Sequence, residues 1–241
     1  MINNTIEKYI LIDSKYRSAG TTSNFKIFLP NQITIASYLQ INCLYLPRLA
    51  YLINQHNNTF SITFGSVVTI ITIPSSNYNP IELASYINSK VSINNFLITY
   101  NQATFQYTFT ANTSFILDFS TSDFYKLLSL NKQIYNSVNN YFYTGIINFN
   151  FPKYININFA NIPNDVMVGN SSSTNFNFII PVMDSNYGDI ISYNNVNYNI
   201  KMKVDNFKTN YLDLIITDDY NHEFENNNGE LFMIIEYNSY N

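Results

Sequence analysis

The stretch VNYNIKMKV, residues 196–204, alternates apolar and polar side chains with a period of two. Successive side chains of a β-strand point to opposite faces of a sheet, so such a strand has one apolar and one polar face. A helix would spread the same residues around its axis. The apolar face carries Val196, Tyr198, Ile200, Met202 and Val204. The stretch therefore predicts a strand with one buried face.

Similar alternations and short apolar runs recur along most of the chain. They predict strands at INFNF (147–151), ININF (155–159), FKIFL (25–29), ASYLQINCLYL (36–46), NFNFIIP (175–181), YLDLIIT (211–217) and LFMIIEY (231–237). Because the chain has only 6 Gly, we expect Asn and Asp at many turns, for example in NNNG at 226–229. These segments predict an all-β fold.

The segment IPSSNYNPIELASYINSKVS (73–92) has a helical pattern instead. Asn79 suits an N-cap, Pro80 suits the first helical position, and Glu82 completes a capping box. Leu83, Ile87 and Val91 then lie on one helical face. Further predicted elements surround this helix: strands at 67–73, 96–101, 104–110 and 115–119, and a short helix at DFYKLLSL (123–130).

These patterns divide the chain into three parts. Residues 60–135 predict a compact α+β insertion. It interrupts a larger β domain, with an N-terminal arm and the first strands at 1–59 and the remaining strands at 136–241.

The charge content is low for a protein of this length. Charged residues make up 12% of the 241 residues, against roughly 25% in an ordinary soluble domain. Lys shares the AT-rich codons that could explain the abundance of Asn, Ile, Tyr and Phe, yet Lys and Arg together number only 12. This shortage favours a surface that neighbouring subunits largely cover.

Net charge and hydropathy exclude several kinds of partner. A net charge of −4 provides no basic field for a phosphate backbone, so we expect no specific nucleic-acid partner. No run approaches the roughly 18 apolar residues of a membrane span, so none is expected. The opening MINNTIEKYILIDSKYR lacks the pattern of a secretory signal, which predicts a protein made inside the cell and not secreted by a signal peptide.

Few residues suit catalysis or cofactor binding. Cys43 is the only cysteine, and neither His56 nor His222 belongs to a metal-binding or catalytic motif. Ser14 follows Asp13 but has no GxSxG context, so turn or capping hydrogen bonds explain the pair better. Glycine-rich phosphate loops are absent from the sequence. We therefore expect no enzymatic activity, no catalytic residue and no cofactor.

The sequence leaves two kinds of binding to consider: a metal cation in an acidic run, and a sugar or a base on tyrosine rings. The run TDDYNHEFENNNGE (217–230) offers hard-cation ligands, but its spacing does not match an EF-hand, and we interpret it as a solvated loop with no metal. Its oxygen-bearing side chains are Asp218, Asp219, Asn221, Glu223 and Glu225. The many tyrosines could form a platform for sugars or bases, although alternating aromatic residues are more often core and interface.

Several motifs, in their order along the chain, resemble one protein family. The N-terminal part contains YILIDSKYR, then FKIFLPNQI, then LPRLAYLINQHNNTF. ITIPSSNYNPIELASYIN, ITYNQATFQYTF and YLDLIITDDYNHEFENNNGELFMIIEY follow. Together they resemble the vertex capsid proteins, or pentons, of virophages and related DNA viruses with double-jelly-roll shells. The resemblance covers most of the chain, least clearly at 136–175.

The resemblance implies a single jelly-roll sandwich with a structural role in the virion. It implies homopentamers at the five-fold vertices, in contact with the double-jelly-roll major capsid protein, and it leaves other minor capsid proteins open as further partners. The strands predicted outside the insertion suffice for one jelly roll. The alternative is a glycan- or receptor-binding β-sandwich, such as a fibre head or another minor capsid protein.

Asp13 and Arg17 are the candidate interface residues. We hypothesise that residues 1–24 form an arm or edge strand along a neighbouring subunit, with FKIFL beginning the barrel. Asp13 and Arg17 would then hold the turn or form an interface ion pair. A local surface salt bridge is an equally good interpretation of the pair.

Overall fold

The computed structural model describes residues 5–149, 152–163, 178–182, 186–195, 200–204 and 206–240. The chain forms two compact units. Unit 1 combines Met1–Ala50 with Pro152–Asn241, and unit 2 is the continuous segment Tyr51–Phe151. Each unit has a core of its own.

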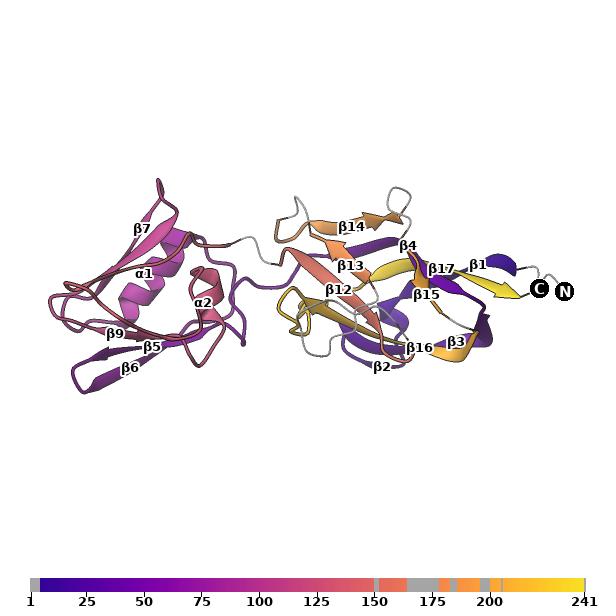
Figure 1. Ribbon diagram of the computed structural model, residues 1–241, viewed down its shortest axis with the longest axis horizontal. Helices are drawn as coiled ribbons and strands as arrows, with labels where there is room; N and C mark the ends of the chain where they lie inside the picture. The colour runs from indigo at the N-terminus through magenta and orange to yellow at the C-terminus, as the bar shows by residue number, and fades with distance from the viewer. Residues whose placement is uncertain are drawn as a thin grey trace. The chain divides into compact units, whose positions relative to one another are not determined.

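Two antiparallel sheets make up unit 1 (Figure 1). The first has the order β1 (Thr5–Asp13), β17 (Phe232–Tyr240), β4 (Tyr38–Pro47) and β14 (Ile190–Asn194), with β15 (Met202–Lys203) also paired to β4. The second has the order β13 (Phe178–Pro181), β12 (Tyr154–Phe159), β16 (Phe207–Asp218), β3 (Asn24–Ile35) and β2 (Ala19–Gly20). One apolar cluster, which includes Ile12, Leu44, Phe159, Leu214 and Ile235, joins strands of both sheets.

The strand order is that of a jelly roll. If the eight principal strands of unit 1 are counted along the chain, the first sheet has the order 1-8-3-6 and the second has the order 5-4-7-2. This pairing places the first strand beside the last, so that Thr5 lies opposite Tyr240 and Asp13 opposite Phe232. The predicted all-β jelly-roll fold is confirmed.

One part of the strand prediction was wrong, and three predicted strands lie partly outside the described residues: 150–151 of INFNF, 175–177 of NFNFIIP and part of VNYNIKMKV. Residues 147–149 of INFNF are not in a strand, because Ile147 and Asn148 donate backbone hydrogen bonds to Phe105 and Leu127 within unit 2. Of VNYNIKMKV, residues 196–199 lie outside the described residues, whereas Met202 and Lys203 form β15.

The hypothesis of an arm that precedes the barrel also needs correction. Thr5–Asp13 forms β1, which pairs along its whole length with β17 of the same chain. Ile12 is fully buried in the core of unit 1. The jelly roll therefore begins at β1 and not at FKIFL, and β1 is an edge strand of this chain's own first sheet.

Unit 2 is an α+β unit built from two small sheets. One has the order β10 (Ile134–Asn136), β9 (Ile116–Asp118), β5 (Thr59–Phe64) and β6 (Val67–Thr72). The other has the order β11 (Tyr141–Tyr143), β8 (Gln106–Thr110) and β7 (Leu97–Asn101). Phenylalanines and isoleucines make up much of its core, where the Phe60 ring stacks on Phe124 at 5.0 Å between centroids.

Its helices are α1 (Pro80–Lys90) and α2 (Phe124–Leu127). The capping box predicted for α1 is present, because Asn79 Oδ1 accepts from the Glu82 amide while Glu82 Oε2 accepts from the Asn79 amide. Unit 2 extends beyond the predicted 60–135. Ile53 bridges to Ser76 on one side, and β11 pairs with β8 on the other.

Asparagine replaces glycine at many turns, as predicted. Among the described residues, ten non-glycine residues have positive φ, and eight of them are Asn. The NNNG turn is one case, with Asn227 and Asn228 at φ 45° and 64° and a Gly229 amide that donates to the Asn226 carbonyl. Within the described part of the chain, no helix is long and apolar enough to cross a membrane.

Candidate assembly surface

The turn that follows β1 is held by the side chains of Asp13 and Arg17. Asp13 ends β1 and caps the short 3₁₀ helix η1 (Ser14–Tyr16), where its Oδ1 accepts from the Lys15 amide at 3.1 Å. Its Oδ2 also lies 3.3 Å from Lys15 Nζ. Because this pair is local and its Lys15 partner is exposed, it shapes the turn more than it stabilises the fold.

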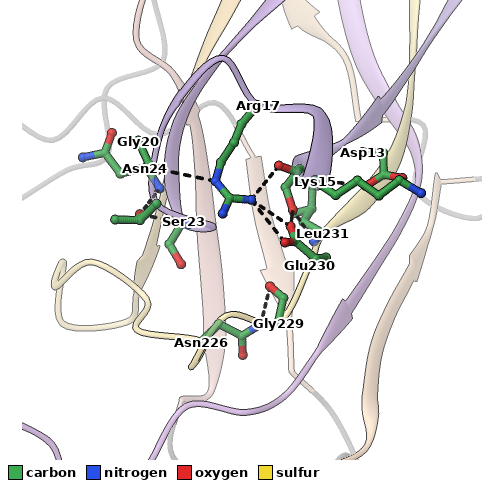
Figure 2. Close-up of polar contacts among 12 residues, drawn as sticks. Asp13, Lys15, Arg17, Gly20, Ser23, Asn24, Asn226, Gly229, Glu230 and Leu231 are labelled. Atoms are coloured by element: carbon green, nitrogen blue, oxygen red, sulfur yellow. Dashed lines mark hydrogen bonds and ion pairs between the residues drawn. The ribbon is translucent and has the colours of Figure 1, made fainter.

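Arg17 connects the turn to a loop that is distant in the sequence, at Glu230 (Figure 2). Its Nη1 donates to both carboxylate oxygens of Glu230 at 3.2 Å and to the Ser14 carbonyl at 2.9 Å. Its Nε donates to the Gly20 carbonyl at 3.3 Å. One guanidinium thus bonds to three separate groups and fixes the path from β1 to β3.

Ser14 completes this arrangement, which we call the Arg17 clamp: Ser14, Arg17, Glu230 and Leu231. The Ser14 side chain is fully buried; its Oγ donates to Glu230 and accepts from the Leu231 amide at 2.8 Å. The clamp fastens the end of β1 to the start of β17. The predicted turn or capping hydrogen bond is present for Asp13, whereas the Ser14 side chain bonds to Glu230 and Leu231, far away in the sequence. The sequence analysis missed Glu230 because it lies 213 residues from Arg17.

The outer face of the first sheet carries a buried carboxylate. Glu236 on β17 is only 7% exposed, and it accepts hydrogen bonds from Tyr38 Oη and Asn42 Nδ2, each at 3.0 Å. Burial acts to raise the pKa of Glu236, but hydrogen bonds from Asn42, Tyr38 and Gln40 outweigh it and hold the pKa below its usual value. Glu236 is therefore held in its charged form.

The same network raises the pKa values of two neighbouring tyrosines, Tyr38 and Tyr9. Burial and the Glu236 carboxylate raise the pKa of Tyr38, whose ring also lies 4.1 Å beneath Lys201 Nζ. The charge of Glu236 is the main cause that raises the pKa of Tyr9, which lies opposite it on β1. Both phenols remain neutral donors at physiological pH.

Beyond this network, the outer face ends at the edge strand β1. Tyr9 and Leu11 project from it and are each 59% exposed, whereas Ile10 and Ile12 point to the core. The far edge of β1 has no partner strand among the described residues. An exposed edge with apolar side chains is a site for contact with another chain.

The two histidines considered for chemistry belong to different units of the chain. His56 lies in unit 2, whereas His222 lies in unit 1, with Nδ1 at 3.7 Å from the Asp218 carboxylate. Asp218 is 3% exposed, and its Oδ1 accepts from the amides of Tyr220 and His222, so it organises the loop and is not solvated as we expected. Among the described residues, no three His, Cys, Asp or Glu side chains gather as a metal site would require.

The comparison with known proteins concerns the fold as a whole. No family model matches the chain, and no curated protein matches its sequence. A search of solved structures finds the crystal structure of the mavirus penton protein, with a TM-score of 0.51 over 97% of this chain and 99% of that chain. The chain has the fold of the mavirus penton protein.

The likeness to the penton protein spans both units, since it covers nearly the full length of each chain. The two sequences are 11% identical, so the likeness is one of fold. The resemblance to pentons that the sequence motifs indicate is confirmed at the level of the fold.

Proposed function

We propose that this chain is a structural capsid protein of a virion, in which five copies form a ring that closes each five-fold vertex. The observation that carries the proposal is the jelly roll with its large insertion, which together match the mavirus penton protein over 97% of the chain. The role is mechanical and not enzymatic. Its partners are further copies of itself and the double-jelly-roll major capsid protein.

The physical basis is a contact between unlike faces of identical chains. Such a head-to-tail contact forms a closed ring when its rotation divides a full turn. The β1 edge supplies one face, through Tyr9, Leu11 and a row of backbone groups that pairs with no other strand in the part of the chain that the structure describes. The Arg17 clamp and Asp13 support this face by holding the end of β1 in place.

Particle assembly tests the function directly. We would co-express the chain with a double-jelly-roll major capsid protein and image the particles by electron cryomicroscopy. Density for five copies at the vertices is expected. Closed particles whose vertices lack the chain, or contain it as a trimer, would overturn the proposal.

A surface substitution tests the role of β1 better than a deletion does. Removing residues 1–16 would expose β17 and remove the buried Ile12, so the fold itself would suffer. Leu11→Lys leaves the core intact, and we expect it to abolish incorporation into particles while the circular dichroism spectrum stays unchanged. Leu11→Met is the matched control, and it should incorporate normally.

A second candidate function is saccharide binding, and one feature of unit 2 favours it. Tyr141 and Tyr143 on the edge strand β11 are exposed, and their rings are parallel to within 10° with centroids 6.4 Å apart. Their cross-strand partners are Thr110 and Thr108, and no charged residue occurs in β7, β8 or β11. Flat rings beside hydroxyl groups suit neutral sugars.

Glycan-array binding separates the two candidates. Binding that the Tyr141→Ala, Tyr143→Ala double variant loses, by a protein absent from capsid vertices, would favour the saccharide function. The absence of binding by the unmodified protein would remove it.

A further inference from the structure

The β6 edge of unit 2 is unusually apolar and exposed. Val68 is 61% exposed and Ile70 is 72% exposed, and β6 has no partner on its far side among the described residues. Neither β5 nor β6 contains a charged residue or a proline. A β-branched edge strand with no charge pairs readily with another strand, and soluble proteins usually protect such an edge.

The opposite edge of the same sheet also carries an aliphatic side chain on the same face. Ile70 lies opposite Ser61, Ser61 opposite Asp118, and Asp118 opposite Ile134 on β10. Directly opposed residues share a face, so Ile70 and Ile134 mark the two ends of one row. Ile134 is 57% exposed. The row is therefore apolar at both edges and polar in its centre.

The strand directions allow this sheet to continue from one chain into the next. The three pairings β6–β5, β5–β9 and β9–β10 are all antiparallel. It follows that β6 and β10 run in opposite directions. If the ring axis runs along the strands, a copy rotated about it keeps its strand directions, so that its β10 lies antiparallel to β6 and its Ile134 comes beside Ile70.

We propose that the β6 edge of unit 2 pairs with the β10 edge of the next copy, so that neighbouring insertions join by β-strand addition. The occupant of the β6 edge is thus a second copy of this chain. The inference rests on the proposed ring. It adds a contact between neighbouring insertions to the contact that the β1 edge makes. Because β10 has only three residues, the contact is short and gains strength from the other contacts of the ring.

Cysteine cross-linking tests this pairing in the full-length chain. Cys43 is the only native cysteine, so Cys43→Ser gives a clean background. In that background, Val68→Cys and Asn136→Cys place thiols at the ends of the neighbouring row, which runs through Thr63 and Ile116. With a short bifunctional thiol reagent, the double variant is expected to give a ladder of covalent species up to the complete ring.

The single cysteine variants test for the alternative contact, in which identical edges of two copies meet. Neither Val68→Cys nor Asn136→Cys alone should cross-link. A covalent dimer from Val68→Cys alone would mean that two β6 edges meet across a two-fold axis, and it would overturn the inference. Rings seen by electron microscopy without a ladder would overturn the inference and leave the proposed function intact. If neither rings nor ladders form, with or without the major capsid protein, both fail.

A charge substitution gives a second, independent measurement. Ile70→Lys should weaken ring formation at least tenfold, because it places an ammonium group beside Ile134 of the next copy. Ile81→Lys is the matched control, since Ile81 is 65% exposed on α1 of the same unit. Equal ring formation by the two variants, each with an unchanged circular dichroism spectrum, would contradict the inference.

Discussion

At the scale of single residues, the most informative groups are polar side chains that the fold buries and fully pairs. Ser14 in the Arg17 clamp and Glu236 on the outer face of the first sheet are the two clearest cases. A buried polar group is costly when its partner is removed, because the group that remains has lost its contact with water as well. Substitutions at these two positions should therefore have measurable effects.

Ser14→Ala should destabilise unit 1. The substitution leaves the Leu231 amide without its Ser14 Oγ acceptor and removes one donor from Glu230, at a cost of about 1–3 kcal/mol in the free energy of unfolding. Urea unfolding followed by tyrosine fluorescence measures this loss. Lys15→Ala is the control, and it should change stability little, because the Lys15 side chain is exposed. Equal stability of the two variants would show that the clamp has no energetic role.

Glu236→Gln should change the dependence of stability on pH. The folded-state pKa of Glu236 lies below its unfolded value, so the carboxylate stabilises the fold above the unfolded pKa, and this contribution is lost as the pH falls through the folded pKa. The unmodified chain should therefore be more stable than the variant at pH 6. The difference should shrink below about pH 4, near the unfolded pKa of Glu. Thermal melts at both pH values test this, and a constant difference would contradict it.

At the scale of elements, two glycines at turns show how the backbone changes direction between strands, one in unit 1 and one in unit 2. Gly20 has φ +96° at the turn between β2 and β3, and a Cβ there would collide with the backbone of Asn24. Gly65 has φ +59° in the β5–β6 turn, but a Cβ there would meet open space. Substitution of Gly65 would cause backbone strain alone, whereas substitution of Gly20 would cause both backbone strain and a steric collision.

Gly20→Ala should cost more stability than Gly65→Ala. Gly65→Ala should cost about 1–2 kcal/mol from left-handed backbone strain alone. Gly20→Ala adds the collision with Asn24, and it should also disturb the Arg17 bond to the Gly20 carbonyl. The free energies of unfolding in urea measure both effects. Gly65→Ala that is as damaging as Gly20→Ala would refute the steric explanation.

At the scale of the whole molecule, two separate cores predict two separate stabilities. Phe60 is buried among phenylalanines in unit 2, whereas Leu214 is buried between the sheets of unit 1. We expect Phe60→Ala to cost about 3–5 kcal/mol and Leu214→Ala about 2–5 kcal/mol, each in its own unit. Hydrogen exchange with mass spectrometry should show lost protection in that unit alone. Lost protection across the entire chain in both variants would mean that the units unfold together.

The sequence by itself determined that most segments are strands with one buried face, because side-chain alternation depends only on local geometry. It also determined α1, since Asn79, Pro80 and Glu82 act within one helical turn. Only the tertiary structure decided that the first strand belongs to the barrel beside the last one, and that Glu230 meets Arg17. A period of two shows which side chains are buried but not which distant strand lies alongside, because that choice depends on packing across the whole core.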